Sequence, residues 1–83
     1  MKVRYFASVR ERIGLAEEEI APPSEVSTVG DLVVWLSRRG EGYAAAFNDA
    51  AKVRAALDQT HARRDTALGS AREVAFFPPM TGG

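Results

Sequence analysis

The chain has 83 residues, with 11 Lys and Arg against 11 Asp and Glu, one His and no Cys. This length suits one small domain, and the absence of Cys excludes disulfides, thiolate nucleophiles and Cys-ligated metal sites, so we expect no bound metal. The balanced charge argues against binding to nucleic acid or to a membrane surface, and without a signal-peptide pattern or a run of about 20 apolar residues we expect a cytoplasmic protein.

An alternating pattern opens the chain and predicts a β-strand over residues 2–9. Its apolar residues would share one face: Val3, Tyr5, Ala7 and Val9. The charged residues 10–14 predict a turn with some helical character. Residues 17–21 predict a short second strand, which ends at Pro22 because proline has no N–H to donate to a sheet. Together the two strands predict an opening hairpin.

The clearest helix pattern covers residues 29–39. Apolar side chains recur there at spacings of three, four and seven, which suits burial on a sheet: Val29, Leu32, Val33 and Leu36. Thr28 and Asp31 approximate a capping box, in which each side chain accepts a hydrogen bond from the other residue's backbone. Gly40 is predicted to stop this helix. Residues 43–47 predict a second, shorter helix.

The second half of the chain predicts three more strands. Residues 52–57 alternate, and a turn at Asp58 and Gln59 separates them from a weaker strand over residues 61–64. The last strand is predicted over residues 73–77. Strands on both sides of one strong helix predict an α+β domain with the helix laid across one face of a mixed sheet.

The C-terminal tail, residues 78–83, is the segment most suggestive of chemistry. Two prolines at its start fix φ and end the last strand, so we expect a domain over residues 1–77 and a tail that projects from it. Gly82 and Gly83 lack Cβ atoms and can thread a channel too narrow for side chains. The reactive group would be the Gly83 carboxylate, which a partner must activate before sulfur or an amine can attack it.

Two phenylalanines are predicted on the solvent side of the sheet. If Val3 and Tyr5 face the helix, alternation places Phe6 and Phe77 on the opposite face. Exposed aromatic side chains beside the tail suggest a docking surface, unless a loop or the second helix covers them. His61, the single histidine, has no neighbouring metal-binding pattern and is interpreted as a surface or interface residue.

Three segments resemble the small subunits of molybdopterin synthase, a family of sulfur carriers with the ubiquitin-like β-grasp fold. They are residues 5–11, residues 58–60 and, above all, the closing run Glu73-Val74-Ala75-Phe76-Phe77-Pro78-Pro79-Met80-Thr81-Gly82-Gly83. The resemblance implies that an adenylating enzyme of the ubiquitin-activating type uses ATP to convert Gly83 to an acyl-adenylate. Sulfur then replaces AMP and leaves a C-terminal thiocarboxylate.

The resemblance also implies a second partner, the large subunit of molybdopterin synthase, in a heterotetramer of two large and two small subunits. Inside the large subunit the thiocarboxylate would donate sulfur to cyclic pyranopterin monophosphate and build the dithiolene of molybdopterin. The chain would act as the sulfur-donating subunit, with no directly bound cofactor and no catalytic group besides Gly83. The implied threading residues are Pro79, Met80, Thr81 and Gly82. The implied interface residues are Phe6, Arg10, His61 and Phe77.

Three other interpretations stay open. A sulfur carrier of the same fold could serve thiamine synthesis or tRNA thiolation, and it would share the tail chemistry. A ubiquitin-like modifier would be joined through Gly83 to lysines of other proteins. A non-covalent adaptor would keep its function when Gly83 is removed.

Overall fold

The computed structural model describes residues 1–48 and 52–79. Along the chain these residues form β1 (Lys2–Tyr5), α1 (Ala7–Ile13), β2 (Glu17–Glu19), α2 (Val29–Ser37), α3 (Glu41–Ala46), β3 (Arg54–Leu57), β4 (Thr60–Ala62) and β5 (Glu73–Phe77). The described strands form one sheet in the order β2-β1-β5-β3-β4. β1 and β5 are parallel, whereas the other neighbours are antiparallel, so the sheet is mixed as predicted.

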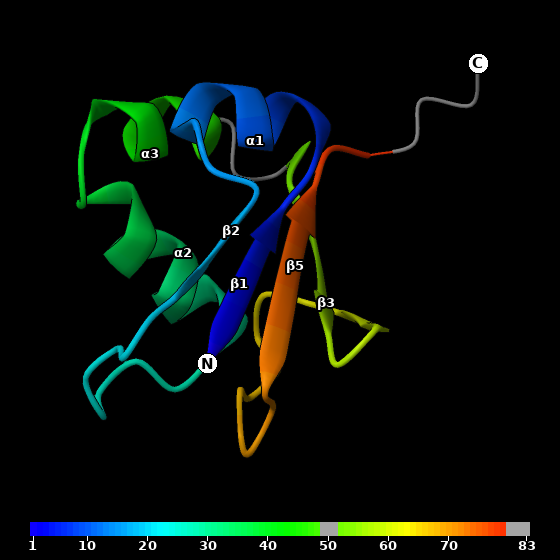
Figure 1. Cartoon of the computed structure of the whole chain (residues 1–83). Coiled ribbons are helices and arrows are strands. Elements are labelled where there is room, and N and C mark those ends of the chain that lie inside the picture. Colours follow the sequence, from blue (N-terminus) through cyan, green and yellow to red (C-terminus); the bar gives the residue numbers. More distant parts are fainter. Residues whose placement is uncertain (49–51, 80–83) are drawn as a thin grey trace.

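The core lies between one face of the sheet and the helices, which Figure 1 shows gathered on one side of β1 and β5. Its fully buried side chains come from both layers: Val3, Tyr5, Val29, Leu32, Leu36, Val74 and Phe76. The Phe47 ring meets the Phe76 ring edge-on, with centroids 5.1 Å apart. None of the helices in the described residues lies over the opposite face of the sheet.

The first strand is shorter than predicted, because β1 ends at Tyr5 and α1 begins at Ala7. Phe6 is still extended, with φ −129° and ψ 151°, and its N–H donates to the Phe76 carbonyl oxygen at 3.1 Å. Ala7 then takes a left-handed φ of 50°, which breaks the extended path. Val9 is buried in this helix as it would be in a strand, so the apolar pattern could not distinguish the two.

The helix α1 also changes the predicted opening hairpin. β1 and β2 pair in antiparallel register, as expected, and the helical character predicted for residues 10–14 is confirmed, but it belongs to a full helix that begins at Ala7. Gly14 ends α1 with a left-handed φ of 87°, and its N–H donates to the Arg10 carbonyl oxygen at 2.7 Å. Glycine adopts this conformation without steric cost, so Gly14 is a local signal for the end of a helix. The alternating apolar pattern over residues 7–9 instead favours a strand.

The helix α2 confirms the predicted capping box. The Asp31 N–H donates to Thr28 Oγ1 at 3.1 Å, and the Thr28 N–H donates to Asp31 Oδ2 at 3.2 Å. The backbone N–H groups of Ser27 and Thr28 hold the pKa of Asp31 below its ordinary value. The carboxylate therefore stays charged at the N-terminus, where it complements the helix dipole.

The predicted end of α2 is wrong by two residues. The helix stops at Ser37, and Arg38 caps it in a right-handed conformation. Gly40, predicted as the stop, is extended and precedes α3 instead. Within α3, Gly42 lies so close to α1 that a Cβ atom would sit 2.5 Å from the Arg12 carbonyl oxygen. Only glycine allows this contact between the two helices.

The β3–β4 hairpin confirms the predicted turn at Asp58 and Gln59, whose φ values of 46° and 71° suit a two-residue hairpin loop. Asp58 Oδ1 also accepts hydrogen bonds from the N–H groups of Arg72 and Glu73, each at 3.0 Å. The turn therefore fixes the start of β5 as well. β4 stops at Ala62, short of the predicted strand end, because the chain then crosses to α2.

A polar cluster joins β1 and β2 to α3. The Glu18 carboxylate accepts hydrogen bonds from the hydroxyls of Tyr5 at 2.8 Å and Tyr43 at 2.6 Å, and it pairs with Arg39 at 3.1 Å. Burial raises the pKa of Glu18, but the bonds from Tyr43 and Tyr5 and the Arg39 charge outweigh it and hold the pKa below 4.5. Burial and the bond to Glu18 raise the pKa of Tyr5 above 10.0.

We expect Glu18 to make the stability of the fold pH dependent. Because its folded-state pKa lies below 4.5, its contribution is complete above that pH and is lost as the pH falls through the folded-state value. Glu18→Gln should lower the free energy of unfolding at neutral pH by about 1–3 kcal/mol and flatten the loss of stability in acid. Urea unfolding over a pH series measures both effects, with the exposed Glu25→Gln as control. Equal stability of the two variants would contradict this role.

Candidate functional site

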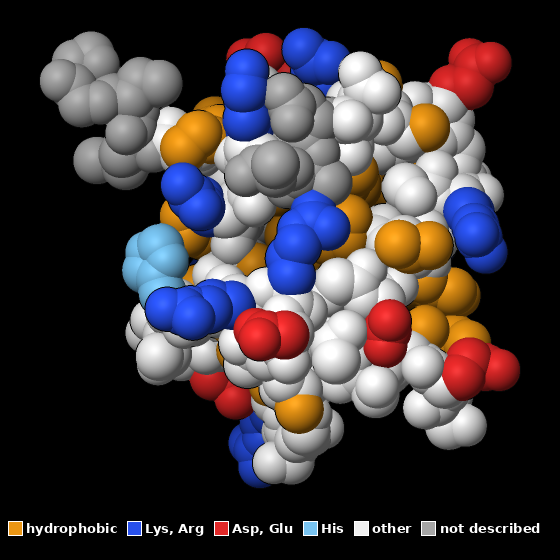
Figure 2. All heavy atoms as spheres, turned by 180° about the vertical axis from the view of Figure 1, so that it is seen from behind, with side chains coloured by type: hydrophobic (Ala, Val, Ile, Leu, Met, Phe, Trp, Pro, Cys, Tyr) orange, Lys and Arg blue, Asp and Glu red, His pale blue; other side chains and the backbone are white. Residues whose placement is uncertain are grey.

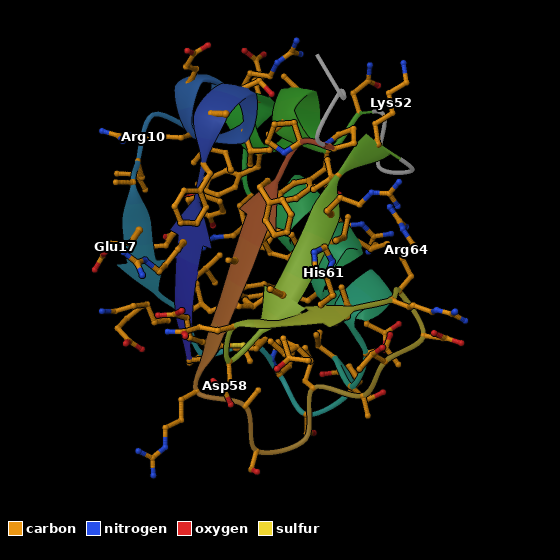
Figure 3. The ribbon with its side chains drawn as sticks, turned by 90° about the vertical axis from the view of Figure 1, so that its right-hand side faces the viewer. Arg10, Glu17, Lys52, Asp58, His61 and Arg64 are labelled. Atoms are coloured by element: carbon orange, nitrogen blue, oxygen red, sulfur yellow. The ribbon has the colours of Figure 1, made fainter. Side chains whose placement is uncertain are left out.

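The open face is the side of the sheet away from the helices, and Figure 3 looks onto it. Paired residues of neighbouring strands share a face, so the register identifies its members. They are Lys2, Arg4, Glu17, Glu19, Arg54, Ala56, His61, Glu73, Ala75 and Phe77. The residues between them, such as Tyr5 and Phe76, point into the core.

Two aromatic side chains lie on this side, as the alternation predicts. Phe6 directly follows β1 in extended conformation and is 41% exposed, with the Arg4 guanidinium 5.7 Å from its ring centroid. Phe77 is half-buried, and its ring meets the His61 ring edge-on at 5.6 Å between centroids. Because β1 and β5 are parallel neighbours, Phe6 and Phe77 stand at the same end of the sheet. Both side chains are therefore at least partly open to solvent.

Charged side chains occupy the rest of the open face. Lys2 and Arg4 pair with Glu17 at 3.3 and 3.9 Å, and Arg4 also lies 3.9 Å from Glu73. Such exposed pairs stabilise the fold by at most about 1 kcal/mol each. These pairs also balance the charge on the β1–β2 side of the open face. Arg54, in contrast, is an exposed cation opposite Phe77 in the strand register. Alternation already placed Arg54 on this side of its strand, although it was not among the predicted site residues.

The tail begins directly beside Phe77. Pro78 and Pro79 are half-buried and border a groove of about 350 Å³ together with residues of α1 and α3. Figure 1 shows the chain turning away from β5 at this point. The last strand ends at Phe77, as predicted, and the division into a domain over residues 1–77 and a projecting tail stays a prediction. Proline at both positions also withholds N–H groups, so the sheet ladder cannot continue.

The other predicted tail residues, Met80, Thr81, Gly82 and Gly83, lie outside the described residues. Their roles in threading and in carrying sulfur stay predictions. Arg10 is exposed on α1, and Figure 3 shows it near the β2 side, away from His61. Arg10 lies one helical turn from Phe6, whose carbonyl oxygen accepts from the Arg10 N–H at 3.3 Å, and its interface role also stays a prediction.

Within residues 1–48 and 52–79, no group of three His, Asp or Glu side chains is placed to hold a metal ion. None of the helices described in these ranges is long and apolar enough to cross a membrane.

Comparison with known proteins gives full-length matches. Residues 3–83 match the model of the ThiS family. The molybdopterin synthase sulfur carrier subunit of Escherichia coli strain K12 is 40% identical over 83 residues, which cover 100% of this chain and 99% of that protein. The subunit of the same name from Mycobacterium tuberculosis is 32% identical over 83 residues, covering 100% of this chain and 96% of that protein.

Solved structures show the same fold. A protein described as molybdopterin converting factor subunit 1 from Pyrococcus furiosus has a TM-score of 0.74 and 30% identity, with 95% of each chain covered. SAMP1 from Haloferax volcanii has a TM-score of 0.72 at 23% identity, covering 100% of this chain and 98% of that one. These likenesses confirm the predicted α+β fold of the β-grasp type. The chain therefore belongs to the ThiS family, as a homologue of the sulfur carrier subunits of molybdopterin synthase.

Proposed function

We propose that this chain is the sulfur carrier subunit of a molybdopterin synthase, and that Gly83 carries the sulfur. The observation that supports the proposal best is full-length identity of 40% and 32% to subunits of that name. The arrangement of the site agrees with it, because exposed aromatic side chains adjoin the strand end from which the tail departs.

The proposed chemistry proceeds in two stages. The Gly83 carboxylate attacks the α-phosphorus of ATP in an adenylating enzyme, which releases pyrophosphate and forms an acyl-adenylate. A sulfur nucleophile then displaces AMP and leaves a thiocarboxylate. In the large subunit, the thiocarboxylate sulfur attacks a carbon of cyclic pyranopterin monophosphate and displaces an oxygen substituent of that carbon, and water then cleaves the acyl–sulfur bond. The carrier returns with its original carboxylate, and a second cycle completes the dithiolene.

In this proposal the fold has a positioning role. The open face docks on the partner through Phe6, His61 and Phe77, and the proline pair directs the tail into the partner's channel. Holding the reacting carboxylate at a defined place replaces a bimolecular encounter by an oriented one. Met80, Thr81 and Gly82 would span the channel. Arg10 would contact the partner at the margin of the face. The assembly would contain two large and two small subunits in the cytoplasm.

The mass of the intact chain tests this proposal. After incubation with ATP, an adenylating enzyme and a sulfur source, we expect the mass change of one oxygen replaced by sulfur, with fragmentation placing it at Gly83. Addition of the large subunit and cyclic pyranopterin monophosphate should return the original mass and yield molybdopterin. An unchanged mass would contradict the proposed sulfur-carrier function. Rescue of a thiazole-synthesis defect, or isopeptide-linked adducts on other proteins, would assign the tail to a different pathway.

A further inference from the structure

A groove of about 810 Å³ lies between α2 and the β3–β4 hairpin, and neither Phe6 nor Phe77 lines it. We call it the basic groove, and its lining residues are Val29, Val33, Val53, Arg54, Ala55, His61, Ala62, Arg63, Arg64 and Phe76. We infer that the basic groove binds an extended acidic segment with a central apolar side chain. The segment would belong to the protein that docks on the open face, so the inference rests in part on the proposed function.

The groove exists because β4 is short. β4 pairs with Ala55 to Leu57 of β3, and the chain then leaves the sheet to reach the start of α2. There the Arg64 carbonyl oxygen accepts from the Gly30 N–H at 2.8 Å. As a result, among the described strands β3 has no neighbour on this side ahead of Ala55. The open edge is one strand residue, Arg54, which gives the end of an extended chain a place beside the sheet.

The rim of the groove is basic. Arg54, Arg63 and Arg64 are exposed, and within the described residues none of them forms an ion pair. The His61 imidazole also lines the groove, whereas no Asp or Glu of the described chain does. Figure 3 shows the resulting asymmetry, with Glu17 at one edge of the sheet and His61 and Arg64 at the other. A chain of zero net charge therefore has a cationic edge that matches an acidic partner.

The floor of the groove is apolar. Val29 and Val33 are contributed by α2, and Val53 and Ala62 are half-buried beside them. Figure 2 shows hydrophobic side chains in a hollow flanked by Lys and Arg on the side where the histidine lies. Cations around an apolar floor suit an aliphatic side chain between carboxylates. They suit nucleic acid less well, since Phe76 in the lining is completely buried and the His61 ring packs edge-on against Phe77, so the groove has no row of exposed rings on which successive bases could stack.

Two residues connect the basic groove to the open face. Arg54 lies opposite Phe77 in the β3–β5 register, and His61 contacts the Phe77 ring. A protein docked on Phe77 therefore covers the mouth of the groove. This continuity favours a segment of that same partner over an unrelated ligand.

The first test is an NMR titration of the full chain with a synthetic peptide that has Leu between Asp and Glu residues. We expect amide shifts confined to the groove residues, at least tenfold weaker binding for R63E/R64E, and unchanged binding for the control R38E/R72E. Arg38 and Arg72 are also exposed and lie outside the groove, so the control carries the same charge change. Replacing the central Leu by Ser should weaken binding as well.

Several outcomes would overturn the inference. They are the absence of shifts, equal effects of the two double variants, equal shifts with inorganic phosphate, or tighter binding of single-stranded RNA at the same residues. The second test measures affinity for the synthase large subunit, where R63E/R64E should be at least tenfold weaker than R38E/R72E. If Phe77→Ala lowers that affinity and R63E/R64E does not, the groove assignment alone fails. If the Gly83 mass change is never seen, the proposed function fails independently.

Discussion

Removal of Gly83, or extension of the chain beyond it by a tag, is expected to abolish sulfur transfer and leave the domain folded. The deletion shortens the reach of the reactive carboxylate, and the extension converts it to an amide that cannot be adenylated. Every buried core residue of the described chain precedes Pro78, so neither change removes core packing. Intact-mass analysis after incubation with ATP, the adenylating enzyme and sulfur measures transfer, and urea unfolding measures the fold.

Gly83→Ala distinguishes the need for a terminal carboxylate from the need for a terminal residue without a side chain. This variant keeps the terminal carboxylate but adds a Cβ atom, so we expect it to form some thiocarboxylate while the deletion forms none. If the tail must pass a channel too narrow for side chains, Gly83→Ala should also slow the later transfer to the pterin. Full sulfur transfer by a chain that lacks Gly83 would refute the central role of the terminus and favour a non-covalent adaptor.

Phe77→Ala is expected to weaken partner binding by about 2 kcal/mol or more, which is roughly a 30-fold loss of affinity. Phe77 lies on the open face, contacts His61 and directly precedes the tail, so a protein that holds the tail must cover it. The truncation should change folding stability little, since the core side chains in this strand are Val74 and Phe76, which are completely buried. Isothermal titration with the large subunit and with the adenylating enzyme measures the loss.

Val34→Ala is the matched control for Phe77→Ala. Val34 is an apolar side chain of α2 that is 47% exposed, and α2 lies on the helical side of the sheet. Its truncation also removes exposed apolar surface, and we expect it to leave both affinities unchanged. Equal affinities of Phe77→Ala and the parent chain would place the docking surface elsewhere, whereas equal losses in the two variants would indicate a nonspecific apolar effect.

The parts of the fold predicted correctly from sequence have local signals. The capping box links residues three apart, the hairpin turn needs residues that tolerate positive φ, and β5 is a short alternating run closed by prolines. The errors occur where local signals are ambiguous. Residues 7–9 suit a strand or a helix turn equally, and contacts with α3 and the sheet favour the helix. Gly40 looked like a helix stop, but the chain needed an extended residue there to enter α3.

The candidate site divides in the same way. Sequence alone predicts a reactive end of the chain, and it determined the proline pair before it and the alternation that places Phe6 and Phe77 on one side of the sheet, because covalent order and side-chain period are local properties. Only the tertiary structure decided that β5 lies between β1 and β3, which brings His61 against Phe77 and gathers Arg54, Arg63 and Arg64 around one groove. Those neighbours depend on pairing between strands far apart in the chain, and the packing of the whole core selects that pairing.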